Sequence, residues 1–260
     1  MTSSLSSDSR LETTKSKSFH LVFLPGLHGT AELFCGLNSA ISKSLEVSFS
    51  TEVSFTKTLI SYPTTISQSY ESLKQWLTKE LKLELRERSQ KIILIAESFS
   101  SPLAIMLADE FPDQIEAVVL GSGFYRSPLN STLSYLPTTP IFKIPIPKIA
   151  VRYFLTGNTS TDDLIQQVRN TVSAIPARVL SERLKSVLTL KENNTKSHPP
   201  TLLLQAQADS LIPLKAQKQL EKHLPQAKSY WINSPHLIFQ THPEICSKHI
   251  IAFLSSCCSI

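Results

Sequence analysis

Short apolar runs alternate with segments of helical periodicity along most of the chain. Runs typical of buried strands occupy residues 19–24, 58–62, 92–95, 117–120, 201–205 and 229–232. Apolar side chains recur every three or four residues over 70–83, 101–111, 214–224 and 243–254, which predicts helices. Because parallel strands need long crossover connections, which helices supply, this alternation predicts an α/β protein whose mostly parallel sheet is covered by helices on both faces.

Residues 127–197 interrupt the alternation, since none of their runs is typical of a core strand. The segment begins rich in proline and apolar residues and continues with helical patterns over 162–172 and 177–190. Its apolar content argues against a disordered linker and favours a lid or cap over the carboxyl edge of the sheet. We therefore expect a disordered tail over residues 1–17, a core made of residues 18–126 and 198–260, and an insertion over 127–197.

A serine stands where the strand at 92–95 turns into the helix at 101–111. The intervening residues 96–100 read AESFS, which places Ser98 at the corner. A strand, a sharp turn carrying the nucleophile and a helix make up a nucleophile elbow, which needs small residues two positions to either side. Ala96 and Ser100 are small, although glycine is usual at both positions. The alternative is that Ser98 or Ser100 only caps the helix.

A nucleophilic serine needs a base, and that base needs a carboxylate to orient it. Asp209 lies in the loop after the strand at 201–205, and His236 lies in the loop after the last predicted strand. The loop GSGFYR after residue 120 offers no carboxylate, and of the seven histidines only His236 follows the last strand. The order Ser98, Asp209, His236 therefore predicts a catalytic triad, with His28 as a weaker alternative base that we expect to line the cleft.

Two backbone N–H groups are expected to form the oxyanion hole. Phe99 supplies one by following the nucleophile, and Leu27, in the sequence LPGLHGT after the first strand, supplies the other. Four of the six glycines also follow strand ends: Gly26, Gly29, Gly121 and Gly123. Open α/β sheets bind ligands at these ends, so two glycine pairs that flank the serine corner suggest a site there.

Together these segments resemble the α/β-hydrolase fold family over nearly the whole chain after residue 17. FLPGLHGTAELF resembles the oxyanion loop, IAESFSSPLA the elbow, LLLQAQADSLIP the acid loop and SPHLIFQTHPE the histidine loop. Within the family, the chain is similar to small carboxylesterases that demethylate pimeloyl-carrier-protein methyl ester. Ala96, Ser100 and Pro235, which stand where glycine is common, depart from the pattern.

The resemblance implies the α/β-hydrolase fold and a serine esterase or thioesterase that needs neither a metal nor an organic cofactor. It implies a small-molecule ester or thioester substrate, free or linked to a carrier protein, and the apolar insertion suggests an apolar acyl group. Three alternatives keep the same fold: an acyltransferase, a cofactor-free haloperoxidase-like enzyme, and a binding protein that has lost turnover.

Composition argues against several other classes of protein. The net charge of +5 is spread along the chain without a basic stripe, so no nucleic-acid partner is expected. There is no G-x-G-x-x-G sequence and no P-loop, which argues against nucleotide binding. No apolar run reaches the roughly 18 residues that a membrane span needs. The four cysteines lack metal-ligand spacing and no secretory signal is evident, which predicts reduced thiols in a cytoplasmic protein.

Overall fold

The computed structural model describes residues 17–49, 53–87, 90–192 and 199–258. The tail expected over residues 1–17 lies outside these ranges, except for Lys17, which begins the first strand.

Six strands form one sheet, in which every pair of neighbouring strands is parallel and the order is β2-β1-β3-β4-β5-β6. The strands are β1 (Lys17–Leu24), β2 (Val53–Leu59), β3 (Lys91–Glu97), β4 (Ile115–Gly121), β5 (Thr201–Ala206) and β6 (Lys228–Ile232). The chain goes outward from β1 to β2 and then returns across β1 to β3, so the direction of winding reverses between β1 and β3. Open α/β sheets bind ligands at the carboxyl ends of the strands beside such a reversal.

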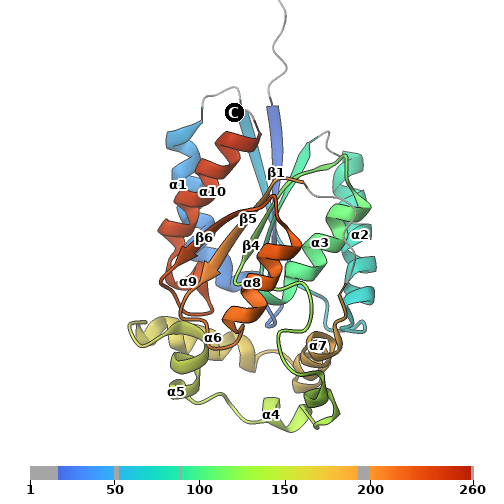
Figure 1. Cartoon of the computed structure of the whole chain (residues 1–260), viewed down its shortest axis with the longest axis vertical. Helices are drawn as coiled ribbons and strands as arrows, with labels where there is room; N and C mark the ends of the chain where they lie inside the picture. Colours follow the sequence, from blue (N-terminus) through green and yellow to red (C-terminus); the bar gives the residue numbers. More distant parts are fainter. Residues whose placement is uncertain (1–16, 50–52, 88–89, 193–198, 259–260) are drawn as a thin grey trace, which may run out of the picture.

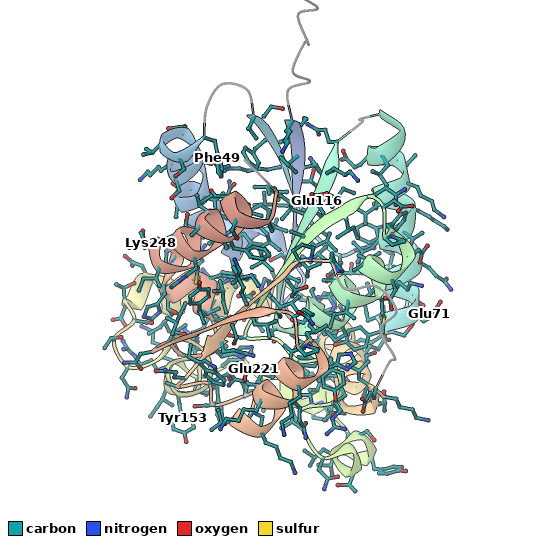
Figure 2. The ribbon with its side chains drawn as sticks, turned by 45° about the horizontal axis from the view of Figure 1, so that its top comes forward. Phe49, Glu71, Glu116, Tyr153, Glu221 and Lys248 are labelled. Atoms are coloured by element: carbon teal, nitrogen blue, oxygen red, sulfur yellow. The ribbon has the colours of Figure 1, made fainter. Side chains whose placement is uncertain are left out.

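Helices cover both faces of the sheet (Figure 1). One face carries α1 (Cys35–Ser48) and α10 (Pro243–Cys257), and the other carries α2 (Tyr70–Glu87), α3 (Ser101–Glu110) and α8 (Leu214–His223). Successive side chains of a strand point to opposite faces, so β1 supplies Val22 to one apolar core and Phe23 to the other. Figure 2 shows the exposed side chains of Glu71 and Lys248 on the outer sides of these layers.

The segment between β4 and β5, called the cap below, contains no strand among its described residues. It lies across the carboxyl ends of the sheet (Figure 1). It holds a 3₁₀ turn (Ser131–Tyr135), α4 (Thr139–Lys143), α5 (Lys148–Val151), a π-helical turn (Arg152–Thr156), α6 (Asp162–Ser173) and α7 (Ala177–Thr189). The two helices predicted here, over 162–172 and 177–190, are confirmed to within one residue. A small apolar core of its own includes Val151, Ile165 and Val168, which pack with Leu237 of the sheet domain.

One predicted strand is displaced, and the sequence pattern does not predict the long helix α1 or the short helices α4, α5 and α9 (Ile238–Thr241). The strand expected over 58–62 is β2, Val53–Leu59, and the chain then leaves it for a buried loop in which Tyr62 N–H donates to the Gly29 carbonyl at 2.8 Å. The first two residues of the run at 58–62 thus end the strand, and the rest of the run reflects burial of Ile60 and Tyr62 in the core. Helix α1 was missed because its buried Leu37, Ile41 and Leu45 are separated by small and polar residues. Among the described residues, no helix is both long and apolar enough to cross a membrane.

Candidate active site

Ser98 stands at the corner between β3 and α3 in a backbone conformation that is unusual for a serine. Its φ is +44°, and a 3₁₀ turn over Ser98–Ser100 leads directly into α3. Neither Ser98 nor Ser100 uses its side chain to cap these helices, so the capping interpretation is wrong. A positive φ at a residue other than glycine costs roughly 1–3 kcal/mol and is found mainly at functional sites, where the surrounding structure holds it in place.

Hydroxyl groups around the corner supply that support. Ser100, where glycine is usual, is fully buried; its hydroxyl donates to the Pro25 carbonyl and accepts from Tyr62 Oη at 2.5 Å. Tyr70 Oη donates to the Phe99 carbonyl at 3.0 Å, and the two rings stack with centroids 5.0 Å apart. Burial raises the pKa of Tyr62 well above its usual range, so this phenol remains a donor. Ser100 is thus accommodated by ties to the loop after β1 and to the loop after β2.

The structure brings His236 and Asp209 together although they lie in loops after different strands. His236 Nδ1 lies 2.8 Å from Asp209 Oδ2, and both side chains are buried. Asp209 Oδ1 accepts hydrogen bonds from the backbone N–H groups of Leu211 and Ile212, each at 2.8 Å. The carboxylate is therefore held on both oxygens, and its orientation fixes the imidazole.

Several charges determine the protonation of His236. Burial lowers its pKa, but the charge of Asp209, the hydrogen bond to Asp209 and the charge of Glu97 oppose burial, and the net pKa lies above the usual histidine value of 6.5. This environment stabilises an imidazolium, which is the form that arises when a histidine removes a proton from a nucleophile.

The loop after β4 positions this histidine in a way that the sequence did not reveal. Ser122, with a φ of +47°, donates its hydroxyl to the His236 carbonyl at 2.6 Å. The glycines beside it allow close packing: a Cβ on Gly121 would lie 2.4 Å from the Phe239 ring, and one on Gly123 would lie 2.7 Å from Ser101 Oγ. Neither glycine is among the residues that line the cavity, so this pair, with Gly123 packed against Ser101 beside the corner, supports the site from behind.

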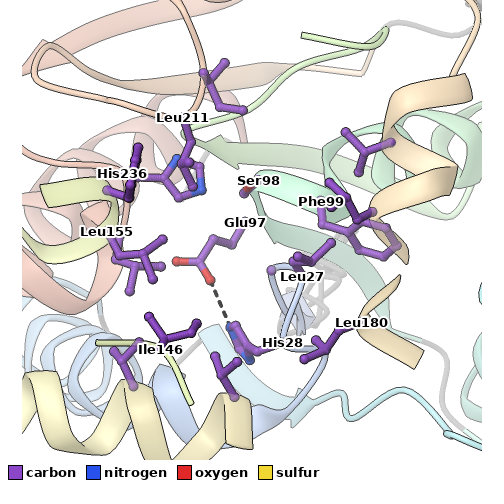
Figure 3. A pocket seen from close by; sticks show the side chains of 18 of the residues that line it. Leu27, His28, Glu97, Ser98, Phe99, Ile146, Leu155, Leu180, Leu211 and His236 are labelled. Atoms are coloured by element: carbon purple, nitrogen blue, oxygen red, sulfur yellow. Dashed lines mark hydrogen bonds and ion pairs between the residues drawn. The ribbon is translucent and has the colours of Figure 1, made fainter. Parts of the chain in front are cut away.

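A cavity of about 320 Å³ lies between the strand ends and the cap segment (Figure 3). Its few polar side chains are those of His28, Glu97, Ser98 and His236. Apolar side chains form the rest of the wall, among them Leu27 and Phe99 from the core and Leu155 and Leu180 from the cap. Of the residues predicted to act, Ser98, His236, Leu27 and Phe99 all line this cavity, whereas Asp209 lies behind His236. As expected, His28 lines the cleft.

The loop after β1, which is predicted to supply the Leu27 N–H to the oxyanion hole, is a tight turn held by the buried Arg183 of α7. Gly29 N–H donates to the Gly26 carbonyl at 2.9 Å, and Gly29 has a φ of +71°. Arg183 Nη1 donates to the carbonyls of Leu27 at 3.0 Å and His28 at 2.8 Å, and its Nε donates to Gln68 Oε1 at 2.9 Å. Burial lowers the pKa of Arg183 to about 10, so it stays charged at neutral pH. A Cβ on Gly29 would lie 2.0 Å from Arg183 Nη1, so the glycine and the arginine depend on each other.

Replacing Arg183 with methionine is expected to lower the free energy of unfolding by about 3 kcal/mol, because three buried acceptors lose their donor at roughly 1–3 kcal/mol each, partly offset by relaxation. The loop that carries Leu27 would also lose its anchor, and we expect kcat to fall by about tenfold. Urea unfolding measures the first effect, and hydrolysis of an activated ester, the activity that the sequence resemblance implies, measures the second. Arg178→Met, which removes an exposed arginine from the same helix, should change stability by less than about 0.5 kcal/mol. Equal losses in the two variants would contradict the anchoring role.

Among the described residues, no group of three or more His, Cys, Asp or Glu side chains could hold a metal ion.

The chain matches a family model described as serine aminopeptidase, S33, over residues 60–239. No curated protein sequence matches it.

Several solved structures are similar in fold. An enol-lactonase from Burkholderia xenovorans is 13% identical, with 92% of this chain and 91% of that chain covered and a TM-score of 0.65. A lipase-esterase related protein from Clostridium acetobutylicum is 13% identical, with 92% and 96% covered and a TM-score of 0.69. An extracellular α/β-hydrolase from a Paenibacillus species is 16% identical, with 91% and 98% covered and a TM-score of 0.62. At such identities the likeness concerns the fold.

Proposed function

Since the chain belongs to the serine aminopeptidase S33 family of α/β-hydrolases, we propose that it is a serine hydrolase that cleaves carboxylic esters or thioesters. The observation that carries the proposal is the hydrogen bond of 2.8 Å between Asp209 and His236, in a site where the imidazole shares one cavity with Ser98. Ser98 is the proposed nucleophile, His236 the base and Asp209 the residue that orients the base.

In the proposed reaction, Ser98 Oγ attacks the acyl carbon while His236 Nε2 takes the hydroxyl proton. The N–H groups of Leu27 and Phe99 stabilise the oxyanion; Phe99 lies in the first turn of a helix, where N–H groups lack intrahelical partners. The bond to the alcohol or thiol then breaks, and the leaving group takes the proton from His236. Water, activated by the same imidazole, attacks the acyl-enzyme and releases the acid and Ser98.

The walls of the cavity support an apolar acyl group as the part of the substrate that it holds. A volume of about 320 Å³ is near the lower end of the range for small-molecule sites, which favours a short or medium acyl chain over a long one. We propose that residues 127–197 act as the lid of this cavity, and that the acyl group is presented as a small ester or on a carrier protein. A cytoplasmic location is supported by the four cysteines, all of which are free thiols.

Labelling with a fluorophosphonate probe tests the proposed function. The probe should modify wild-type protein at Ser98, as located by mass spectrometry of the labelled peptide, and should not modify Ser98→Ala. Ser210→Ala removes an exposed hydroxyl from the Asp209 loop and should be labelled like wild type. Labelling of Ser98→Ala at the wild-type rate, or ester hydrolysis that survives this change, would refute the mechanism. Esters of graded chain length would then define the acyl preference.

A further inference from the structure

Glu97 is a fully buried carboxylate that the proposed triad does not use. It immediately precedes Ser98, has no exposed surface and lines the cavity. Its Oε2 lies 3.4 Å from His28 Nε2, while its Oε1 is buried and has no hydrogen-bond partner among the described residues. In Figure 3 the dashed contact joins one oxygen to His28, and the other oxygen points away from His28, on the side of Leu155.

The contrast with Asp209 shows how incompletely this carboxylate is satisfied. Asp209 is held by His236 and by two backbone N–H groups, all at 2.8 Å. Glu97 has one long contact and otherwise faces a mainly apolar wall. A buried polar atom without a partner costs about 1–3 kcal/mol, and more when the group is charged. Such a cost is expected to persist where a ligand supplies the missing donor.

From this geometry we propose that Glu97 and His28 form a polar subsite for a hydrogen-bond donor, a hydroxyl or a protonated amine, that the substrate carries close to its scissile carbonyl. The inference rests on the proposed function, because it concerns the substrate of the same site. The preferred substrates are therefore hydroxyacyl or aminoacyl esters, and a plain acyl ester is a poorer one.

The position of the carboxylate places this donor near the reacting carbonyl. A Cβ on Gly26 would lie 3.0 Å from Glu97 Oε2, so the carboxylate packs against the residue that precedes Leu27 in the oxyanion loop. Glu97 is also next to the nucleophile in sequence. A group that reaches Oε1 while the carbonyl sits between Ser98 and Leu27 can be separated from that carbonyl by only a few bonds.

Electrostatics favours the same conclusion. A carboxylate beside an oxyanion hole opposes the negative charge that develops there, and the effect is large where water is excluded. An ammonium group of the substrate would neutralise the charge of the carboxylate, and a hydroxyl would donate a hydrogen bond to it. A site built to bind a substrate hydroxyl or amine also rejects an analogue without it far more strongly than an apolar wall rejects an extra methylene.

Three matched methyl esters test the subsite: methyl butanoate, methyl 3-hydroxybutanoate and methyl 3-aminobutanoate. With wild-type protein, kcat/KM for the hydroxy ester, the amino ester or both should exceed that for methyl butanoate by about tenfold or more. Glu97→Met removes the acceptor and should bring the ratios to about one or below. Glu97→Gln keeps an acceptor without the charge, so it should abolish a preference for the amine and retain part of a preference for the hydroxyl. Glu71→Gln, an exposed glutamate on α2, should leave the ratios unchanged.

Ratios within about twofold of one in wild type, or a preference that survives Glu97→Met, would overturn the subsite while leaving the proposed hydrolase intact. A second measurement needs neither turnover nor a Glu97 variant: calorimetric binding of the three esters to Ser98→Ala. Tighter binding of a donor-bearing ester supports the subsite, and equal binding overturns it. The proposed function would instead be refuted if the protein were not labelled by the fluorophosphonate and hydrolysed none of the three esters. The calorimetric binding of the esters would then decide on the subsite alone.

Discussion

Replacing Ser98 or His236 with alanine is expected to lower kcat for ester hydrolysis by about 10⁶-fold, and replacing both should cost no more than either change alone. The reason is that the proposed nucleophile and base would act as one unit: a serine without a base is a poor nucleophile, and a base without the serine has no proton to remove. Single-turnover hydrolysis of an activated ester by Ser98→Ala, His236→Ala and the double variant measures the effect. Losses that multiply in the double variant would show that the two residues act independently.

A matched histidine separates this effect from a general loss of structure. His242 follows His236 by six residues, is partly exposed, and contacts Thr241 through Nδ1 at 2.9 Å. It is not among the residues that line the cavity. His242→Ala should therefore keep kcat within about twofold of wild type, because surface changes away from buried networks have small effects. Thermal melts of all four variants show whether the fold is retained.

The order of the elements was predictable because parallel strands buried on both faces leave continuous apolar runs. β1, β3, β4 and β5 each carry such a run, and each lies within two residues of its predicted bounds; the edge strand β6 lies within one residue of its predicted bounds although it is only partly buried. β2 lies at the edge of the sheet and is only partly buried, so its sequence VSFTKTL lacks that run. The apolar run at 58–62 instead placed the predicted strand partly in the following loop, because a buried loop produces the same apolar pattern as a buried strand.

The residues proposed for the triad could be located from the sequence because each stands just after a strand. The carboxyl ends of parallel strands meet at one edge, so chain order and strand positions suffice to place Ser98, Asp209 and His236 near one another. Arg183 could not be found in this way. It reaches the loop after β1 from α7, about 155 residues away along the chain, and nothing in its own helix distinguishes it from the exposed Arg178.

Glu97 was overlooked for a different reason. The residue between Ala96 and Ser98 has no prescribed chemistry in an elbow, and the sequence alone does not show that its side chain is fully buried beside His28. A carboxylate directly before a predicted nucleophile is nevertheless a signal that sequence reasoning could use. A residue that ends a strand directly before the predicted nucleophile must lie close to the group that would react.

Replacing Asp209 with asparagine is expected to lower kcat by about 10⁴-fold while leaving the fold intact. The hydrogen bonds of the carboxylate explain why. Oδ1 accepts from the N–H groups of Leu211 and Ile212, and an asparagine keeps those bonds only by placing its oxygen there. Its NH₂ group then faces His236 Nδ1, which must accept instead of donate. The proton of the neutral imidazole moves to Nε2, where it can no longer receive the proton of Ser98.

The pH profile provides a second readout that a merely structural role would not change. The base must be neutral to act, and the pKa of His236 lies above 6.5 because Asp209 and Glu97 outweigh the effect of burial. In wild type, kcat/KM should therefore rise with pH through an inflection above 6.5. In Asp209→Asn the charge of the aspartate is gone and burial lowers the pKa, so the residual activity should persist to lower pH.

Asp162→Asn removes an equal charge from the exposed partner of Arg152 and should leave both kcat and the inflection unchanged. An inflection at the same pH in Asp209→Asn and wild type would mean that His236 is not the titrating base, or that Asp209 does not act on it.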